Sequence, residues 1–154
     1  MIDIQIASDA DIPEVKNLFR EYAVWVGVDL SFQGFDDELE GLPGDYAQPT
    51  GVLFVARVDG RVAGCVAAHQ WSPATCEMKR LFVRDSFRSF GCGRVLVESI
   101  ITWARESGFK RVLLDTLPSM GRAQHLYLRL GFREIAPYRP NPVPGARFLE
   151  LSLE

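Results

Sequence analysis

Hydrophobic and polar residues alternate with two different periods along this chain of 154 residues. Near the start, isoleucine alternates with polar residues over 2–6, which is the period of a half-buried strand. Apolar residues then recur at helical spacing over 13–26, after Asp11 with Glu14 three residues later, a spacing typical of a capped helix start. The chain is therefore predicted to begin with a strand followed by an amphipathic helix.

A hairpin and a further strand are predicted in the middle of the chain. Residues 51–58 and 62–71 read as strands on either side of Asp59–Gly60, a dipeptide that suits the positive φ angles of a tight turn. Another strand is predicted over 76–83. The preceding stretch, 27–51, is rich in Gly and Pro and is predicted to be the least regular part, a candidate lid over a substrate.

The second half continues the alternation of helices and strands, and these predictions define the fold class. The expected elements are a helix from about Gly93 to the stop at Gly108, a strand over 111–117, a helix after Ser119 as N-cap, and strands over 132–135 and 146–153. Together the elements predict an α/β fold: a mixed, mostly antiparallel seven-stranded sheet with helices on both faces. No repeat or linker divides the chain, so residues 1–154 are expected to form one domain.

Net charge, the length of the apolar runs and the cysteine spacing limit which partners, which cellular location and which metal or disulfide sites are expected. The net charge of −3 gives no attraction to a phosphate backbone or an anionic membrane, so nucleic acid and membrane are not expected partners. No apolar run reaches about 18 residues and the N-terminus does not resemble a leader, so a cytoplasmic location is expected. Cys65, Cys76 and Cys92 form no CxxC or Cys/His cluster, and neither a disulfide scaffold nor a metal site is expected.

The segment Arg88–Arg94, RSFGCGR, carries the strongest chemical signal. It lies between a strand ending at Val83 and a helix beginning near Gly93, so its glycines and the helix N-terminus offer backbone amides to an anion. Arg88 and Arg94 add positive charge suited to phosphate oxygens. An ordinary β–α turn is the alternative, whereas the residues that follow exclude a P-loop and a dinucleotide fingerprint.

Two stretches resemble known motifs of one protein family. Residues 76–104, CEMKRLFVRDSFRSFGCGRVLVESIITWA, resemble the central motif of the GNAT superfamily of N-acetyltransferases, whose R/Q-x-x-G-x-G/A binds the pyrophosphate of acetyl-CoA. Residues 123–132, AQHLYLRLGF, are similar to the family's downstream A-x-x-L-Y-x-x-x-G-F signature. The resemblance implies an acetyl-CoA-dependent N-acetyltransferase whose sheet splays at the fourth and fifth strands.

The resemblance also implies where the cofactor lies. The backbone of Leu81, Phe82 and Val83 would pair with the pantetheine arm, and Arg88 would stand at the edge of the cradle. The amides that would hold the pyrophosphate belong to Ser89, Phe90, Gly91, Cys92, Gly93 and Arg94. The sequence departs from the family at Met120, where many members place an Asn that contacts the cofactor. Acetyl-CoA is the only cofactor expected, as co-substrate and without a metal.

Three residues are candidates for the chemistry. Tyr127 occupies the family's LY position and would protonate the departing thiolate, although a core tyrosine is the alternative. Glu77 has the spacing of the catalytic glutamate in histone-modifying members, but it could also be an edge residue or a partner of Lys79 or Arg80. Asp115 could replace Glu77 as the base, pair with the same cations or bind the acceptor; a water relay is a further alternative.

The acceptor is expected to be the primary amine of a small molecule. Asp115 and Arg139 are the predicted substrate-binding residues, because a cationic loop residue suits an acceptor that carries a carboxylate. Two alternatives stay open: a non-catalytic acyl-CoA-binding module, and an enzyme that acetylates peptides or proteins. The resemblance allows a homodimer formed through the terminal strands. His69 and His125 are predicted to have surface or capping roles.

Overall fold

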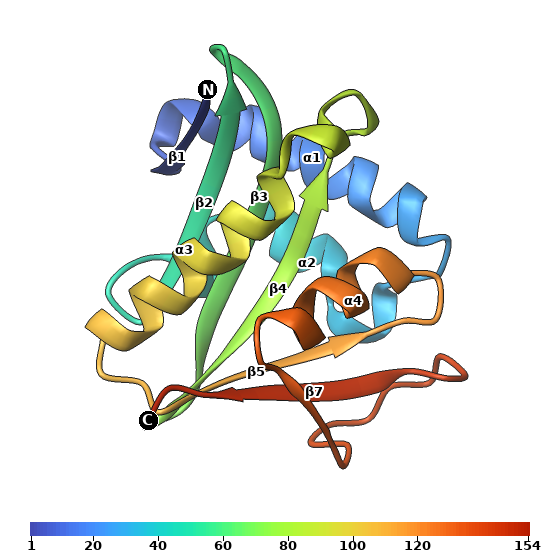
Figure 1. The fold of residues 1–154 in the computed structure, drawn as a ribbon. Helices are drawn as coiled ribbons and strands as arrows, with labels where there is room; N and C mark the ends of the chain where they lie inside the picture. Colours follow the sequence, from blue (N-terminus) through green and yellow to red (C-terminus); the bar gives the residue numbers. More distant parts are fainter.

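The computed structural model describes residues 1–154, in which helices and strands alternate much as the sequence predicts (Figure 1). The elements are β1 (Ile2–Ile6), α1 (Ile12–Val26), α2 (Phe35–Glu40), β2 (Gly51–Val58), β3 (Arg61–Ser72), β4 (Thr75–Val83), α3 (Cys92–Glu106), β5 (Arg111–Thr116), α4 (Gly121–Arg129), β6 (Arg133–Ile135) and β7 (Arg147–Ser152). No helix combines the length with the apolar character that crossing a membrane demands.

The seven strands form one sheet in the order β1-β2-β3-β4-β5-β7-β6. Every neighbouring pair is antiparallel except β4 and β5, which confirms the predicted mixed α/β sheet. β4 and β5 pair only from Thr75 to Glu77 against Arg111 to Leu113. Beyond this short pairing the two strands diverge, as Figure 1 shows, and the predicted splay is confirmed.

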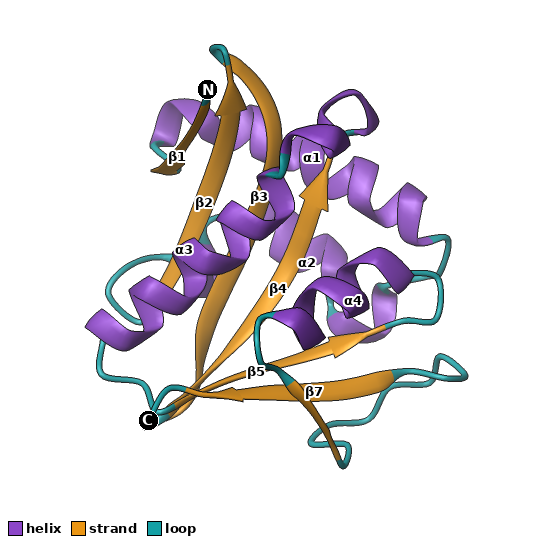
Figure 2. Cartoon of the chain, viewed as in Figure 1, coloured by secondary structure: helices purple, strands orange, loops and turns teal.

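Helices cover both faces of the sheet, as predicted, and each face has its own core. α3 and α4 lie on one face and α1 and α2 on the other (Figure 2). Alternating residues of β2 supply both cores: Val52 and Ala56 pack beneath α3, whereas Leu53 and Val55 pack beneath α1. The sheet is therefore buried on both sides, which explains why its central strands are so apolar.

A bulge interrupts β4 next to the splay. Cys65 of β3 faces Phe82 and Ala67 faces Lys79, so β4 has one residue more than β3 between these pairs, and Arg80 has a φ of 64°. Because of the extra residue, two consecutive side chains, Lys79 and Arg80, lie on the α1/α2 side: the Arg80 guanidinium stacks over the ring of Phe35 at 5.1 Å. The sequence contained no signal for this bulge.

Three predictions about turns and caps meet different outcomes. The hairpin turn is confirmed, with φ angles of 50° at Asp59 and 81° at Gly60. Asp11 is confirmed as the N-cap of α1, but its carboxylate makes no capping hydrogen bond to this helix and accepts hydrogen bonds from Ser8 instead, at 2.9 Å from the Ser8 backbone nitrogen.

The prediction that Ser119 is the N-cap of α4 is wrong, because Met120 occupies that position. Its sulfur accepts hydrogen bonds from Thr116 Oγ1 at 3.5 Å and the Leu117 amide at 3.4 Å. Met120 is therefore tied to the chain that leaves β5.

Candidate active site

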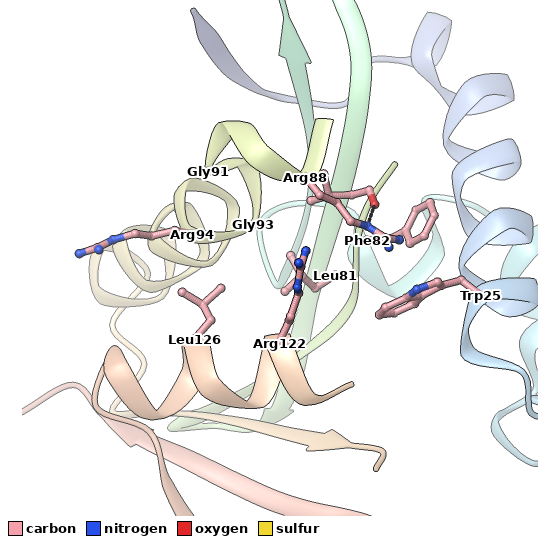
Figure 3. Close-up of a pocket in the computed structure, with 11 residues that line it drawn as sticks. Trp25, Leu81, Phe82, Arg88, Gly91, Gly93, Arg94, Arg122 and Leu126 are labelled. Atoms are coloured by element: carbon pink, nitrogen blue, oxygen red, sulfur yellow. Dashed lines mark hydrogen bonds between the residues drawn. The ribbon is translucent and has the colours of Figure 1, made fainter. Parts of the chain in front are cut away.

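A cleft opens where β4 and β5 separate, bounded by the end of β4, the start of α3 and α4 (Figure 3). Its volume is about 230 Å³. The lining residues are Trp25, Leu81, Phe82, Val83, Arg88, Gly91, Gly93, Arg94, Arg122, Ala123 and Leu126. Seven of the ten residues predicted to bind the cofactor are in this set; Ser89, Phe90 and Cys92 are not, and the Cys92 side chain is fully buried.

The start of α3 turns unpaired backbone donors toward this cleft. Gly91 precedes the helix with a φ of 83°, a conformation that favours glycine. The first helical hydrogen bond runs from the Val95 amide to the Gly91 carbonyl at 3.3 Å, so the preceding amides have no helical partner. Gly93 has a different role: a Cβ there would stand 3.8 Å from Leu126 and 4.0 Å from Val83 and would extend into the cleft. The geometry is that of an anion site.

Three arginines line the cleft, and they differ in direction. Arg88 donates from Nε to the Val83 carbonyl at 2.8 Å and stacks over Trp25 at 5.0 Å. Arg94 is exposed, pairs with Glu98 at 3.4 Å and points away from the cleft in Figure 3. Arg122 extends from α4 into the cleft. Its position one residue before the second motif was a signal that the sequence analysis missed.

A smaller cavity of about 40 Å³ lies deeper in the splay and is named the inner cavity here. It is lined by Tyr22, Trp25, Gln33, Met78, Lys79, Arg80, Leu81, Leu114, Asp115, Met120, Ala123 and Tyr127. The inner cavity shares Trp25, Leu81 and Ala123 with the cleft, so the two are adjacent. Tyr127 and Asp115, both predicted from the sequence, therefore face one cavity.

Tyr127 combines both readings that the sequence left open. Its ring is 5% exposed and packs against Phe132 with centroids 5.6 Å apart, as a core residue does. Its hydroxyl has no hydrogen-bond partner in the protein, and the residue lines the inner cavity. Burial raises the pKa of Tyr127 well above that of a free tyrosine, so the phenol keeps its proton.

Asp115 lies half-buried near the end of β5 and accepts a hydrogen bond from Asn141 Nδ2 at 3.1 Å. Of the alternatives for Asp115, pairing with Lys79 or Arg80 is wrong, because no ion pair joins it to either cation. Arg80 is bound instead by both oxygens of Glu38, at 2.8 and 2.9 Å. This pair attaches α2 to the bulge of β4, and it leaves Asp115 without a cationic partner.

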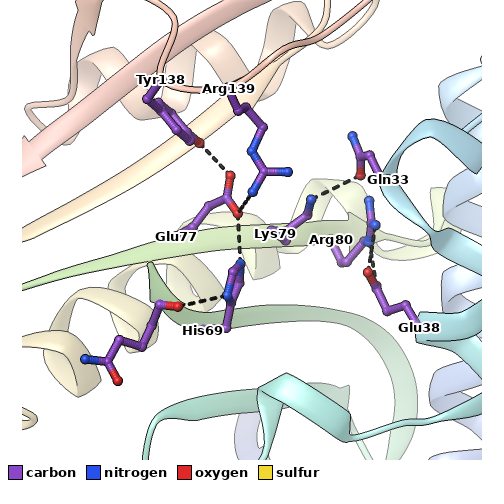
Figure 4. Close-up of polar contacts among 9 residues, drawn as sticks. Gln33, Glu38, His69, Glu77, Lys79, Arg80, Tyr138 and Arg139 are labelled. Carbon is purple, nitrogen blue, oxygen red and sulfur yellow. Dashed lines mark hydrogen bonds and ion pairs between the residues drawn. The ribbon is translucent and has the colours of Figure 1, made fainter. Parts of the chain in front are cut away.

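Glu77 is fully buried and lies outside the inner cavity. Its carboxylate is 2.7 Å from Arg139 Nη2, 2.6 Å from the Tyr138 hydroxyl and 2.8 Å from His69 Nε2 (Figure 4). Burial acts to raise its pKa, but hydrogen bonds from His69 and Tyr138 and the charges of Lys79 and Arg139 outweigh burial and lower it.

The surface or capping role predicted for His69 is therefore wrong, since its ring is bound to a buried carboxylate. The edge-residue reading of Glu77 is wrong as well, because β4 is a central strand and Glu77 lies within it. Glu77 does find a cationic partner, but the partner is Arg139 rather than Lys79 or Arg80.

A third hollow, named the polar pocket here, lies on the α2 side with a volume of about 440 Å³. It is lined by Gln33, Gly34, Asp37, Glu38, Gly41, Pro43, Gly44, Asp45, Tyr46, His69, Lys79 and Arg139. It shares Gln33 and Lys79 with the inner cavity. Most of its wall comes from the segment predicted as a lid, and the predicted substrate-binding residue Arg139 is part of it.

Comparison with known proteins gives the family. The family model described as "Acetyltransferase (GNAT) family" matches residues 12–132. The chain belongs to the GNAT family of acetyltransferases. An N-acetyltransferase of Schizosaccharomyces pombe, described as uncharacterized, is 39% identical over 145 residues, which cover 93% of this chain and 89% of the relative. This GNAT protein is thus an acyltransferase.

Solved structures agree with the GNAT fold. A GNAT-family acetyltransferase from Staphylococcus aureus superposes with a TM-score of 0.83 at 21% identity over the whole of both chains. A putative acetyltransferase from Salmonella typhimurium, solved with its cofactor acetyl-CoA, has a TM-score of 0.77 at 19% identity and covers 99% of this chain and 94% of the other. At these identities the likeness establishes the fold.

Proposed function

We propose that this GNAT enzyme transfers an acetyl group from acetyl-CoA to the primary amine of a small molecule, by direct attack in a ternary complex. The observation that carries the proposal is that three hollows adjoin one another. The cationic cleft borders the inner cavity, which Tyr127 and Asp115 line, and the inner cavity borders the polar pocket on the α2 side. The polar pocket has the volume of a small-molecule site, about 300–1,000 Å³, which supports a small acceptor.

The residues of the cleft fit acetyl-CoA. Because β4 and β5 diverge after Glu77, the edge of β4 from Leu81 onward has no strand beside it on the β5 side, so its backbone groups can pair with an amide-bearing arm. The amides after Gly91 and the guanidinium of Arg122 suit the pyrophosphate. When bound, acetyl-CoA supplies the thioester that an amine attacks.

Arg122→Gln is expected to weaken CoA binding by about 10–100-fold, the equivalent of about 1.5–3 kcal/mol for a hydrogen bond to a charged group. Isothermal titration calorimetry with CoA measures the dissociation constant of each variant. Arg94→Gln is the matched control, because Arg94 points outward and pairs with Glu98. Pantetheine, which lacks phosphates, should bind both variants like the wild type. An equal loss for both variants with CoA would contradict the placement of the pyrophosphate beside Arg122.

Within the inner cavity we assign the base role to Asp115 and the acid role to Tyr127. Asp115 is half-buried and makes only one hydrogen bond, so its carboxylate retains free lone pairs for an amine proton. Glu77 is enclosed by three donors, and those contacts support a structural role in orienting Arg139 and His69. Tyr127 stays protonated and can donate its proton to the departing thiolate.

The test is release of free CoA thiol across a panel of small amines. Wild-type turnover with at least one amine is expected, and Asp115→Asn should lower kcat/KM by about 100-fold or more, the lower end of general-base effects. Binding of CoA without turnover on any amine would favour the non-catalytic module. Unchanged turnover in Asp115→Asn would return the base role to Glu77 or to a water.

A further inference from the structure

We infer that the acceptor is an amino acid whose carboxylate, next to the reacting amine, is bound by Lys79. This inference rests on the proposed function and narrows its substrate class. Lys79 was not among the site residues predicted from the sequence. It is the one residue with a full positive charge that lines both the inner cavity and the polar pocket.

Lys79 is the cation of this site that has no counter-ion. Arg80 is held by Glu38 and Arg139 by Glu77, but no carboxylate oxygen lies within 4.0 Å of the Lys79 ammonium. Its one hydrogen bond goes to the amide oxygen of Gln33, at 3.1 Å (Figure 4). An ammonium has three donors, so two are available to a ligand.

The surroundings of Lys79 favour an anion beside it. Its side chain is half-buried, and burial followed by the charge of Arg80 lowers its pKa. A partly buried ammonium without a counter-ion is costly, and a ligand carboxylate would relieve that cost through charge-assisted hydrogen bonds. The charges of Glu77 and Asp115 raise the pKa of Lys79, but neither carboxylate lies within 4.0 Å of its ammonium.

Asp115 and Lys79 together match the two charged ends of an amino acid. Both line the inner cavity, yet they make no ion pair with each other, so each is available to a ligand. An amine bound at Asp115 would place a carboxylate on the same carbon toward Lys79. The remainder of the acceptor would enter the polar pocket, where Asp37 and Asp45 have no ion-pair partners, so a polar or cationic side chain fits there.

Matched trios of acceptors test this inference: arginine, argininamide and agmatine, and the corresponding trio from lysine. The members of a trio share the reacting amine and differ in the carboxylate. For the wild type, kcat/KM for the acid should exceed that for the amide and the decarboxylated amine by about 10–100-fold, from loss of one hydrogen bond to a charged group.

Lys79→Met should remove this preference by lowering kcat/KM for the acid alone. Lys79→Arg, which keeps a cation, should retain a preference for the acid. Thermal unfolding and CoA binding, measured on both variants, establish that each is folded.

Three outcomes overturn the inference. Wild-type enzyme that uses acid, amide and amine equally well has no carboxylate site, although its amine acetylation would leave the proposed function standing. A loss in Lys79→Met that is equal across a trio would place Lys79 in the chemistry rather than in recognition. Faster acetylation of peptide N-termini than of free amino acids would assign the polar pocket to a peptide. Absence of turnover with every amine contradicts the proposed function itself.

Discussion

Tyr127→Phe should lower kcat by about two to four orders of magnitude, the range of general acid catalysis, while the fold stays intact. The removed hydroxyl lines the inner cavity and has no partner in the protein, so its loss breaks no internal hydrogen bond. The ring contact with Phe132 remains. Steady-state kinetics with a productive amine give kcat, and thermal unfolding and CoA titration report on fold and cofactor binding.

Tyr22→Phe makes the same chemical change in the same cavity from the α1 side, and a loss of only a few-fold is expected there. The raised pKa of Tyr127 adds a second expectation: with an amine that carries no carboxylate, and so does not depend on Lys79, wild-type activity should not decline where a free tyrosine ionises, near pH 10. Wild-type turnover by Tyr127→Phe would mean that the thiolate leaves without this proton.

Glu77→Leu should lower the free energy of unfolding by about 3–5 kcal/mol, since it leaves the half-buried guanidinium of Arg139 and two further hydrogen-bond donors without their buried acceptor. Arg139, Tyr138 and His69 all lose their contact with this carboxylate. For a chain of this size the melting temperature should fall by about 10 °C. Denaturant titration and thermal unfolding measure the effect, and Glu77→Gln, which keeps an acceptor oxygen, should lose less.

The pH dependence of this stabilisation has a definite sign. The folded-state pKa of Glu77 lies below the ordinary value of 4.5, so folding favours the ionised carboxylate. Its contribution is complete above the unfolded-state pKa and is lost as pH falls through the folded-state pKa. The stability gap between the wild type and Glu77→Gln should therefore narrow as pH drops below about 4.5. A gap that stays constant over this range would contradict the proposed charge network.

The fold could be predicted well from the sequence because the hydrophobic periodicity that distinguishes a helix from a strand is visible within each short segment. Seven strands, both layers of helices and the turn at Asp59–Gly60 follow from hydrophobic patterning and turn chemistry. The bulge at Arg80 does not, because the rings that Arg80 packs against, Tyr22 of α1 and Phe35 of α2, come from segments distant in the sequence. Ser119 was wrong as the N-cap of α4 for a local reason: Met120 takes that position, and its sulfur accepts a hydrogen bond from Thr116, a contact that no capping rule describes.

In the candidate site, too, the parts formed by residues close in sequence were predicted and the parts formed by distant residues were missed. The cleft was predicted because its motif is continuous in sequence, from Leu81 to Arg94. The network around Glu77 was missed because its partners stand far away in the chain: 61 and 62 residues for Tyr138 and Arg139. A free ammonium such as that of Lys79 is recognised only after the partners of every neighbouring carboxylate are known.

The bulge in β4 also gives a criterion for comparing relatives. A relative with one residue fewer between Glu77 and Val83 could form a regular strand with the same side chains turned toward α3. It would lack the additional arginine that donates to both oxygens of Glu38. It would therefore also lack the ion pair that attaches residues 35–40 to the sheet. Chain length in this short interval should therefore separate relatives that share the proposed acceptor site from those that share only the proposed cofactor cleft.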